Sequence, residues 1–224
     1  MGFDGCNAMM IFAHPDDAEL LSFGLMRRIF LSGGNIDVLI VSDGSSGIAV
    51  GESALDQLPL VRMQETRNAL RNIARDVTTL ALPDGKITPD GDTVRVIEAA
   101  IVDKRPDLVV THHLDGTGTD HQDHRAVASA VRNICFRKPF VTTILSVEPL
   151  QPFTDFKPTC FVDITDHLDE KCEALKHHVS QAGRAYLDKA FHSARGLRWS
   201  SLVATKPSHD DRVFETYAIE KTVW

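Results

Sequence analysis

Short apolar runs alternate along this chain with longer stretches in which apolar residues recur at helical spacing. The runs have the length of buried strands, and the stretches between them predict amphipathic helices. We therefore expect strands at residues 9–13, 36–42, 77–82, 108–111 and 140–147, and helices at 18–31, 60–74, 92–102 and 125–135. Strands that alternate with helices predict a Rossmann-like, doubly wound α/β fold, with a mostly parallel sheet and helices on both faces.

The alternation weakens beyond Leu150. We expect a short strand at 161–164, a helix at 165–178 and a further helix at 185–194. His177 and His178 would end the first of these helices, where imidazole complements the helix dipole. The last apolar segments, 201–205 and 213–219, predict either an antiparallel edge pair or a single last strand. The chain then forms one domain over residues 1–224, with a core at 7–150 and a C-terminal part, 151–224, that completes the fold and the pocket.

Composition narrows the choice of function. With 224 residues, of which 43% are hydrophobic, the chain can bury the core of one α/β domain. A net charge of −7 argues against a nucleic-acid partner, which would normally meet a basic face. No stretch approaches the roughly 20 apolar residues of a membrane span, and the first residues lack the features of a secretory signal. The four scattered cysteines are typical of reduced thiols, so we expect a cytoplasmic protein; its oligomeric state is open, and a homo-oligomer is one option.

The first predicted strand ends in a cluster of metal-binding residue types. His14, Asp16, Asp17 and Glu19 follow it within six residues, at the edge where open α/β sheets keep their active sites. His14 and Asp17 offer an imidazole and a carboxylate, which suit Zn²⁺ in a catalytic site with a vacant position. Asp16 would then be a spare carboxylate, suited to act as general base. The alternative is that Asp16 and Asp17 only cap the next helix.

A second cluster follows the fourth predicted strand. Four of the ten histidines lie within residues 112–124. His121 and His124 are three residues apart at the start of a predicted helix and would share one face of it, so that one could bind metal while the other faces the substrate. The alternative is a polar turn with an Asp cap. In a parallel sheet both clusters reach the same rim, together with the loop at Asp43 and with Asp84.

The two motifs together resemble a known family. Ala13-His14-Pro15-Asp16-Asp17-x-Glu19 and His121-x-Asp123-His124 are similar to the paired motifs of the PIG-L/LmbE-type zinc-dependent N-deacetylases. Weaker similarities lie at 41–47, 62–65, 82–85 and 214–217. Many members have Glu where this chain has Ala18, so Glu19 receives no role.

The resemblance implies a role for each matching residue. Zn²⁺, or another divalent metal, would be bound by His14, Asp17 and His124. Asp16 would be the general base, His121 would stabilise the oxyanion as an imidazolium, and Asp123 would hold an imidazole in its tautomer. Arg62 and Asp84 would contact sugar hydroxyls; for Arg62 the alternative is an ion pair with Glu65 on a helix surface.

The implied function is a hydrolase that removes the N-acetyl group from an N-acetylglucosamine-type sugar or glycoconjugate. A zinc amidohydrolase for a non-sugar N-acyl amide is the first alternative. A non-catalytic sugar-nucleotide-binding protein is the second, although no Gly-x-Gly-x-x-Gly follows the first strand. We expect specificity to come from the C-terminal third and from loops at 45–58, a candidate lid, and 154–157. Four further side chains either close the far side of a sugar pocket or form a solvated basic face: Arg184, Arg195, Arg198 and Trp199.

Overall fold

The computed structural model describes residues 5–47, 57–151, 154–203 and 211–223. Most of the candidate lid, residues 48–56, lies outside this described part of the chain. Seven strands form one sheet in the order β3-β2-β1-β4-β5-β7-β6. The first five strands are parallel: β1 (Asn7–Phe12), β2 (Asn35–Ser42), β3 (Asp76–Leu82), β4 (Leu108–Thr111) and β5 (Thr143–Val147).

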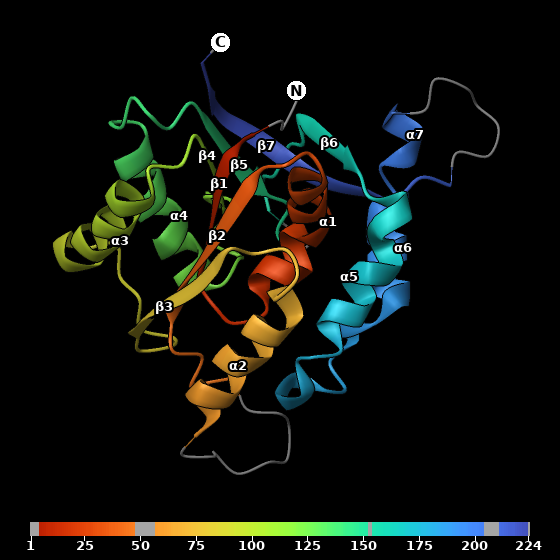
Figure 1. The fold of residues 1–224 in the computed structure, drawn as a ribbon, viewed down its shortest axis with the longest axis horizontal. Helices are drawn as coiled ribbons and strands as arrows, with labels where there is room; N and C mark the ends of the chain where they lie inside the picture. The colour runs from red at the N-terminus through yellow and green to blue at the C-terminus, as the bar shows by residue number, and fades with distance from the viewer. Residues whose placement is uncertain (1–4, 48–56, 152–153, 204–210, 224) are drawn as a thin grey trace.

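Helices cover both faces of this sheet (Figure 1). One face carries α1 (Asp17–Leu31), α2 (Leu58–Leu70), α5 (Leu168–Leu175) and α6 (Lys189–Leu197), and the other carries α3 (Gly91–Lys104) and α4 (Gln122–Cys135). The position of β1 at the centre of the sheet, with both of its faces covered, explains why its sequence is continuously apolar. Met10 and Phe12 belong to the hydrophobic core on one side, and Met9 and Ile11 to the core on the other. The expected doubly wound α/β fold is therefore confirmed.

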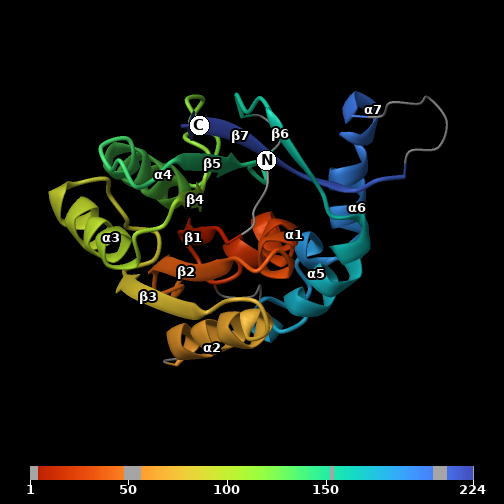
Figure 2. The same cartoon turned by 45° about the horizontal axis from the view of Figure 1, so that its top comes forward.

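The C-terminal third extends the sheet with two antiparallel strands. β7 (Phe214–Thr222) pairs with β5, and β6 (Cys160–Asp163) pairs with β7 at the edge. The sheet can be followed from β3 to β7 in Figure 2, where it curves around α1. Of the two options for the last apolar segments, the single last strand is correct, because Ser200–Val203 form the short helix α7.

The predicted helix at 165–178 is shorter than expected. A 3₁₀ turn occupies Thr165–His167, and α5 ends at Leu175. His178 lies beyond it and is buried, with its Nε2 3.1 Å from Glu19 Oε1. The expected interaction of His178 with a helix dipole is therefore wrong: a carboxylate on α1 is its partner.

At a kink in α1, the N-terminal part of the chain is hydrogen-bonded to strand β7 of the C-terminal part. Ser22 has non-helical backbone angles, so the next turn begins with free N–H groups. Gly24 N and Leu25 N donate to the carboxylate of Glu215 on β7, at 3.0 and 2.9 Å. The same carboxylate accepts from Lys171 Nζ and from the Tyr217 hydroxyl. β7 thus holds the helix that begins at the first cluster. No helix of the described residues is long and apolar enough to cross a membrane.

Candidate active site and metal centre

The loop between β1 and α1 presents His14, Asp16 and Asp17 at the carboxyl edge of the sheet. His14 N donates to Asp17 Oδ2 at 2.7 Å, which ties the first residue of α1 back to the loop. Asp16 occupies the N-cap position with φ at 114°, in the left-handed region, and its side chain makes no capping hydrogen bond. The alternative that Asp16 merely caps the helix is therefore wrong.

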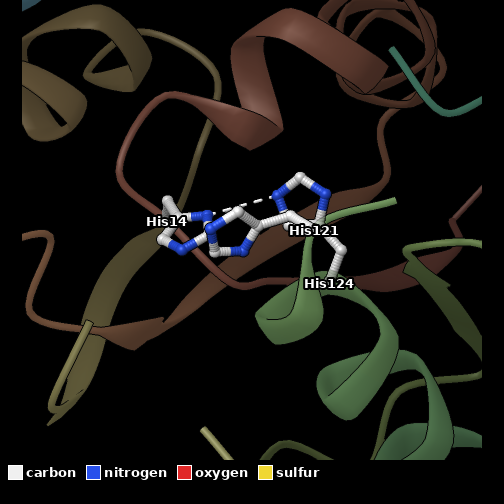
Figure 3. Close-up of side chains that lie close together, drawn as sticks. All are labelled: His14, His121 and His124. Atoms are coloured by element: carbon white, nitrogen blue, oxygen red, sulfur yellow. Dashed lines mark hydrogen bonds between the residues drawn. The ribbon is translucent and has the colours of Figure 1, made fainter. Parts of the chain in front are cut away.

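The second cluster meets the first across 110 residues of sequence. His14 Nδ1 lies 3.2 Å from His124 Nε2 and 3.4 Å from Asp17 Oδ2, and His124 Nε2 lies 3.5 Å from Asp17 Oδ1. Figure 3 shows His14 from the loop after β1 turned toward His121 and His124 at the start of α4. Tetrahedral zinc with bonds of about 2.0–2.2 Å separates its ligand atoms by roughly 3.3–3.5 Å. The distances between the two imidazole nitrogens, and from each of them to one oxygen of the Asp17 carboxylate, are of this size.

Three further groups of donors lie within 4.8 Å of one another, two of them at the side of His14 Nδ1 and His124 and one at the opposite ring nitrogen, His14 Nε2. They are His14 with His121 and His124, Asp17 with His112 and His124, and His14 with Asp84 and Asp123. His112 is already engaged, because its Nε2 accepts from Ala13 N at 2.9 Å and its ring stacks on His124. Burial, followed by the charge of His124, lowers the pKa of His112 to about 4 and keeps it neutral. His112 thus shapes the site as a buried acceptor.

Carboxylates hold the outer nitrogens of both candidate ligands. His14 Nε2 lies 3.1 Å from Asp84 Oδ1 and 3.2 Å from Asp123 Oδ2, and His124 Nδ1 lies 3.1 Å from Asp120 Oδ1. Such partners fix the tautomer and the orientation of a metal-binding imidazole. No role was predicted for Asp120, although an Asp four residues before a His at a helix start is a signal that could have found it.

Asp123 is fully buried, and its two oxygens also accept from Gly85 N and Ile87 N at 2.7 and 3.1 Å. These contacts give it the geometry of a residue that orients His14 from behind. Its predicted role of holding an imidazole tautomer stays a prediction.

Asp16 and Arg62 form a buried pair beside the ligands. Burial raises the pKa of Asp16 to about 6, although the charge of Arg62 opposes the shift. Arg62 Nη2 lies 3.3 Å from Asp16 Oδ2. The surface ion pair with Glu65 is wrong, because Arg62 is only 3% exposed and Glu65 instead accepts from Ser180 N and Oγ.

His121 is held as a neutral donor. Its Nδ1 accepts from Asp123 N at 3.2 Å, where it caps α4, so a proton is left to Nε2. Burial and the neighbouring rings of His14 and His124 lower its pKa. These contacts contradict the expected imidazolium and favour the neutral ring with an Nε2–H.

A cavity of about 340 Å³ opens over these groups. Asp16, Arg62 and Asp84 border it together with the loop residues Ser46 and Gly47. The chain after β5 contributes another part of the wall, namely Leu150, Gln151, Gln181, Arg184 and Tyr186. Arg184 thus lines the cavity, which agrees with the alternative that it closes the far side of a pocket.

Arg195, Arg198 and Trp199 are not among the described residues that line this cavity. They converge on the buried Glu148, with Trp199 Nε1 3.0 Å from its Oε2, while Arg195 Nη1 also donates to Pro149 O. The Arg195 side chain is largely buried, whereas the Arg198 side chain is 49% exposed, so a solvated basic face describes Arg198 alone.

A model of the PIG-L family, described as GlcNAc-PI de-N-acetylase, matches residues 9–135, more than half of the chain. The chain belongs to the PIG-L family. This confirms the resemblance and the expected enzyme class, a deacetylase.

Three proteins illustrate what this PIG-L member is similar to. The diacetylchitobiose deacetylase of Thermococcus kodakarensis is 26% identical over 184 residues, which cover 77% of this chain and 69% of that protein. The N,N'-diacetylchitobiose deacetylase of Pyrococcus horikoshii superposes with a TM-score of 0.82 at 18% identity, over 97% of this chain and 85% of that one. GalB, the 4-carboxy-2-hydroxymuconate hydratase of Pseudomonas putida KT2440, gives 0.81 at 19% identity, over 98% of both chains. The fold thus carries hydratases as well as deacetylases, and the activity has to be argued from the site.

Proposed function

We propose that this chain is a zinc-dependent hydrolase that removes the N-acetyl group from an N-acetylglucosamine-type sugar or glycoconjugate. The observation that carries the proposal is the convergence of His14 Nδ1, the Asp17 carboxylate and His124 Nε2 at 3.2–3.5 Å, beside the carboxylate of Asp16, which is paired with Arg62. Two imidazoles and one carboxylate form a donor set that suits Zn²⁺ in an open catalytic site, although another divalent metal could occupy it. The bound ion would polarise the acyl carbonyl and lower the pKa of the attacking water.

The chain's own residues account for the proton transfers. Asp16 takes a proton from water as the oxygen attacks the acyl carbon, and it returns that proton to the nitrogen when the C–N bond breaks. Acetate and the free amine are the products. A pKa of about 6 leaves Asp16 ionised at neutral pH, yet basic enough to accept the proton.

His121 supplies the complementary donor. Its Nε2–H would point to the acyl oxygen and stabilise the negative charge that develops there. Because Asp123 N occupies Nδ1, the ring keeps this tautomer during the reaction. The two ligand histidines would keep a fixed orientation relative to this donor, because Asp120 holds His124, and Asp84 and Asp123 hold His14.

The sugar substrate is inferred from the relatives and the size of the site. The family description and the two named deacetylases concern N-acetylated amino sugars. A cavity of about 340 Å³ is of a size that accommodates small-molecule ligands. Asp84, on its wall, would contact a sugar hydroxyl. Location in the cytoplasm also remains a proposal, supported by four free cysteines.

An acetate-release screen tests the proposal. The zinc-loaded protein should release acetate from N-acetylglucosamine conjugates and lose this activity on chelation. Simple N-acetyl amines of similar size form the second arm, and their preferential hydrolysis would favour the non-sugar alternative. A protein that binds zinc but releases acetate from neither group is not a deacetylase of this kind.

A further inference from the structure

Asp16 is held in a backbone conformation that its own helix does not stabilise. Its φ of 114° is unfavourable for a residue with a Cβ, and such a conformation persists only where the surroundings hold it. Its carboxylate makes no hydrogen bond to the N-terminus of α1. Another group must therefore fix both the backbone and the side chain.

One nitrogen of Arg62, on α2, contacts both the backbone next to Asp16 and the Asp16 side chain. Its Nη2 donates to Pro15 O at 2.7 Å, directly before Asp16, and lies 3.3 Å from Asp16 Oδ2. Its Nη1 donates to Gly44 O at 2.8 Å. Both terminal nitrogens of this buried guanidinium are thus bonded to oxygens of the protein, which fixes the group beside Asp16.

The guanidinium fits only because two glycines leave room for it. A Cβ on Gly47 would lie 2.0 Å from Arg62 Nη1 and 2.7 Å from its Cζ, and one on Gly44 would lie 3.0 Å from Nη1. The turn that contains them is held from outside, since Gln181 Nε2 donates to Gly47 O at 2.6 Å. The two glycines of the stretch 41–47 therefore provide the space in which the Arg62 guanidinium packs.

We propose that Arg62 is a positioning residue that fixes Asp16 for proton transfer, and that Gly44 and Gly47 form the seat on which this depends. With Oδ2 held by Arg62, Oδ1 is the oxygen that receives the proton. The inference rests on the proposed function and departs from the sugar contact that the family resemblance implies for Arg62.

Kinetics of Arg62→Ala separate positioning from substrate binding. A misplaced base lowers kcat by about 100-fold and changes KM little, with zinc content unchanged. Guanidinium ion added to this variant should restore part of kcat by filling the vacated seat. Arg67→Ala is the matched control on the same helix, since Arg67 is exposed and its Nε donates only to Val77 O at 3.4 Å. An unchanged kcat with a raised KM would instead make Arg62 a substrate contact and overturn the proposal.

A double-mutant cycle tests the seat. Gly47→Ala should lower kcat when Arg62 is present and have little further effect in the Arg62→Ala background. Gly91→Ala is the control, because a Cβ there meets nothing within 4 Å. Additive losses would contradict the proposed coupling. If Arg62→Ala does not fold, Arg62→Lys and Gly47→Ala still allow the comparison of kcat with KM.

Crystal structures of the zinc-loaded wild type and Arg62→Ala provide a readout independent of turnover. The carboxylate of Asp16 should be displaced or spread over several conformers, while Asp17 stays in place. An unmoved Asp16 would overturn the inference. If the wild type releases acetate from no substrate, the proposed function fails, and the crystallographic result still decides the role of Arg62.

Discussion

In the first two thirds of the chain, most buried charged side chains gather where β1, β3 and β4 end, whereas Glu148, after β5, and Glu215, on β7, lie inside the fold among side chains of the last third. Asp16 and Asp17 border a cavity of about 340 Å³. Glu148 and Glu215 border a void of about 10 Å³, which has room for at most one water. The two carboxylate oxygens of Glu215 accept hydrogen bonds from four donors of the protein itself. Buried charge therefore does not by itself mark an active site; room for a ligand does.

The largest effect should follow removal of a metal ligand from the first region. His124→Ala leaves two protein donors where a catalytic zinc site needs three. We expect zinc content close to zero and no measurable acetate release, with folding retained, because the cluster is stabilised by its carboxylate contacts. Zinc analysis and circular dichroism check both parts. Full activity in a zinc-free variant would refute the ligand assignment.

Asp16→Asn tests the neighbouring base and should be the next largest effect. The amide cannot accept the proton, so kcat should fall by about 10²–10⁴-fold. Zinc should stay bound, because Asp16 is not one of the three converging donors. Acetate release and zinc content measured on the same sample separate this variant from His124→Ala. Loss of zinc from Asp16→Asn would show that Asp16 is a ligand.

In the last third, Glu215→Gln should reduce stability instead of chemistry. The amide leaves Lys171 without its 2.9 Å charged partner in a buried site, and breaking such a pair costs about 3–5 kcal/mol. We expect the free energy of unfolding by denaturant to fall by that amount, while kcat per folded molecule changes little. A variant of normal stability but low kcat would mean that Glu215 acts on the site through α1.

The same contrast explains what the sequence could reveal. The meeting of His14, Asp17 and His124 could be predicted because their clusters follow the apolar strands β1 and β4, and parallel strands end on one rim. The partners of Glu215 and His178 could not be predicted, because their contacts span up to 191 residues and have no local pattern. The short helix α7 was not predicted for a related reason, since the four residues Ser200–Val203 are too few for their pattern to distinguish helix from strand. His121 was given the wrong charge because its state depends on a backbone N–H of the folded helix.

The pH dependence of the rate should reflect the first region alone. Burial raises the pKa of Asp16 to about 6. The base works when deprotonated, so the rate should fall about tenfold per pH unit below that pKa and level off above it. The lowered pKa of His121 keeps its ring neutral over the plateau. A profile of kcat/KM from pH 4.5 to 8.5 checks this, and a flat profile would remove Asp16 from the rate-determining proton transfer.

The smallest effect is expected for Trp199→Phe in the last third. The change removes the 3.0 Å hydrogen bond from Trp199 Nε1 to Glu148 and keeps an aromatic ring beside Phe161. A hydrogen bond to a charged group contributes about 1.5–3 kcal/mol, and Thr216 Oγ1 remains as a donor to the same oxygen. We expect a loss at the lower end of that range in the free energy of unfolding, with kcat and KM unchanged. A raised KM at normal stability would instead place Trp199 in contact with the substrate, and the division between a catalytic first region and a structural last third would fail at that residue.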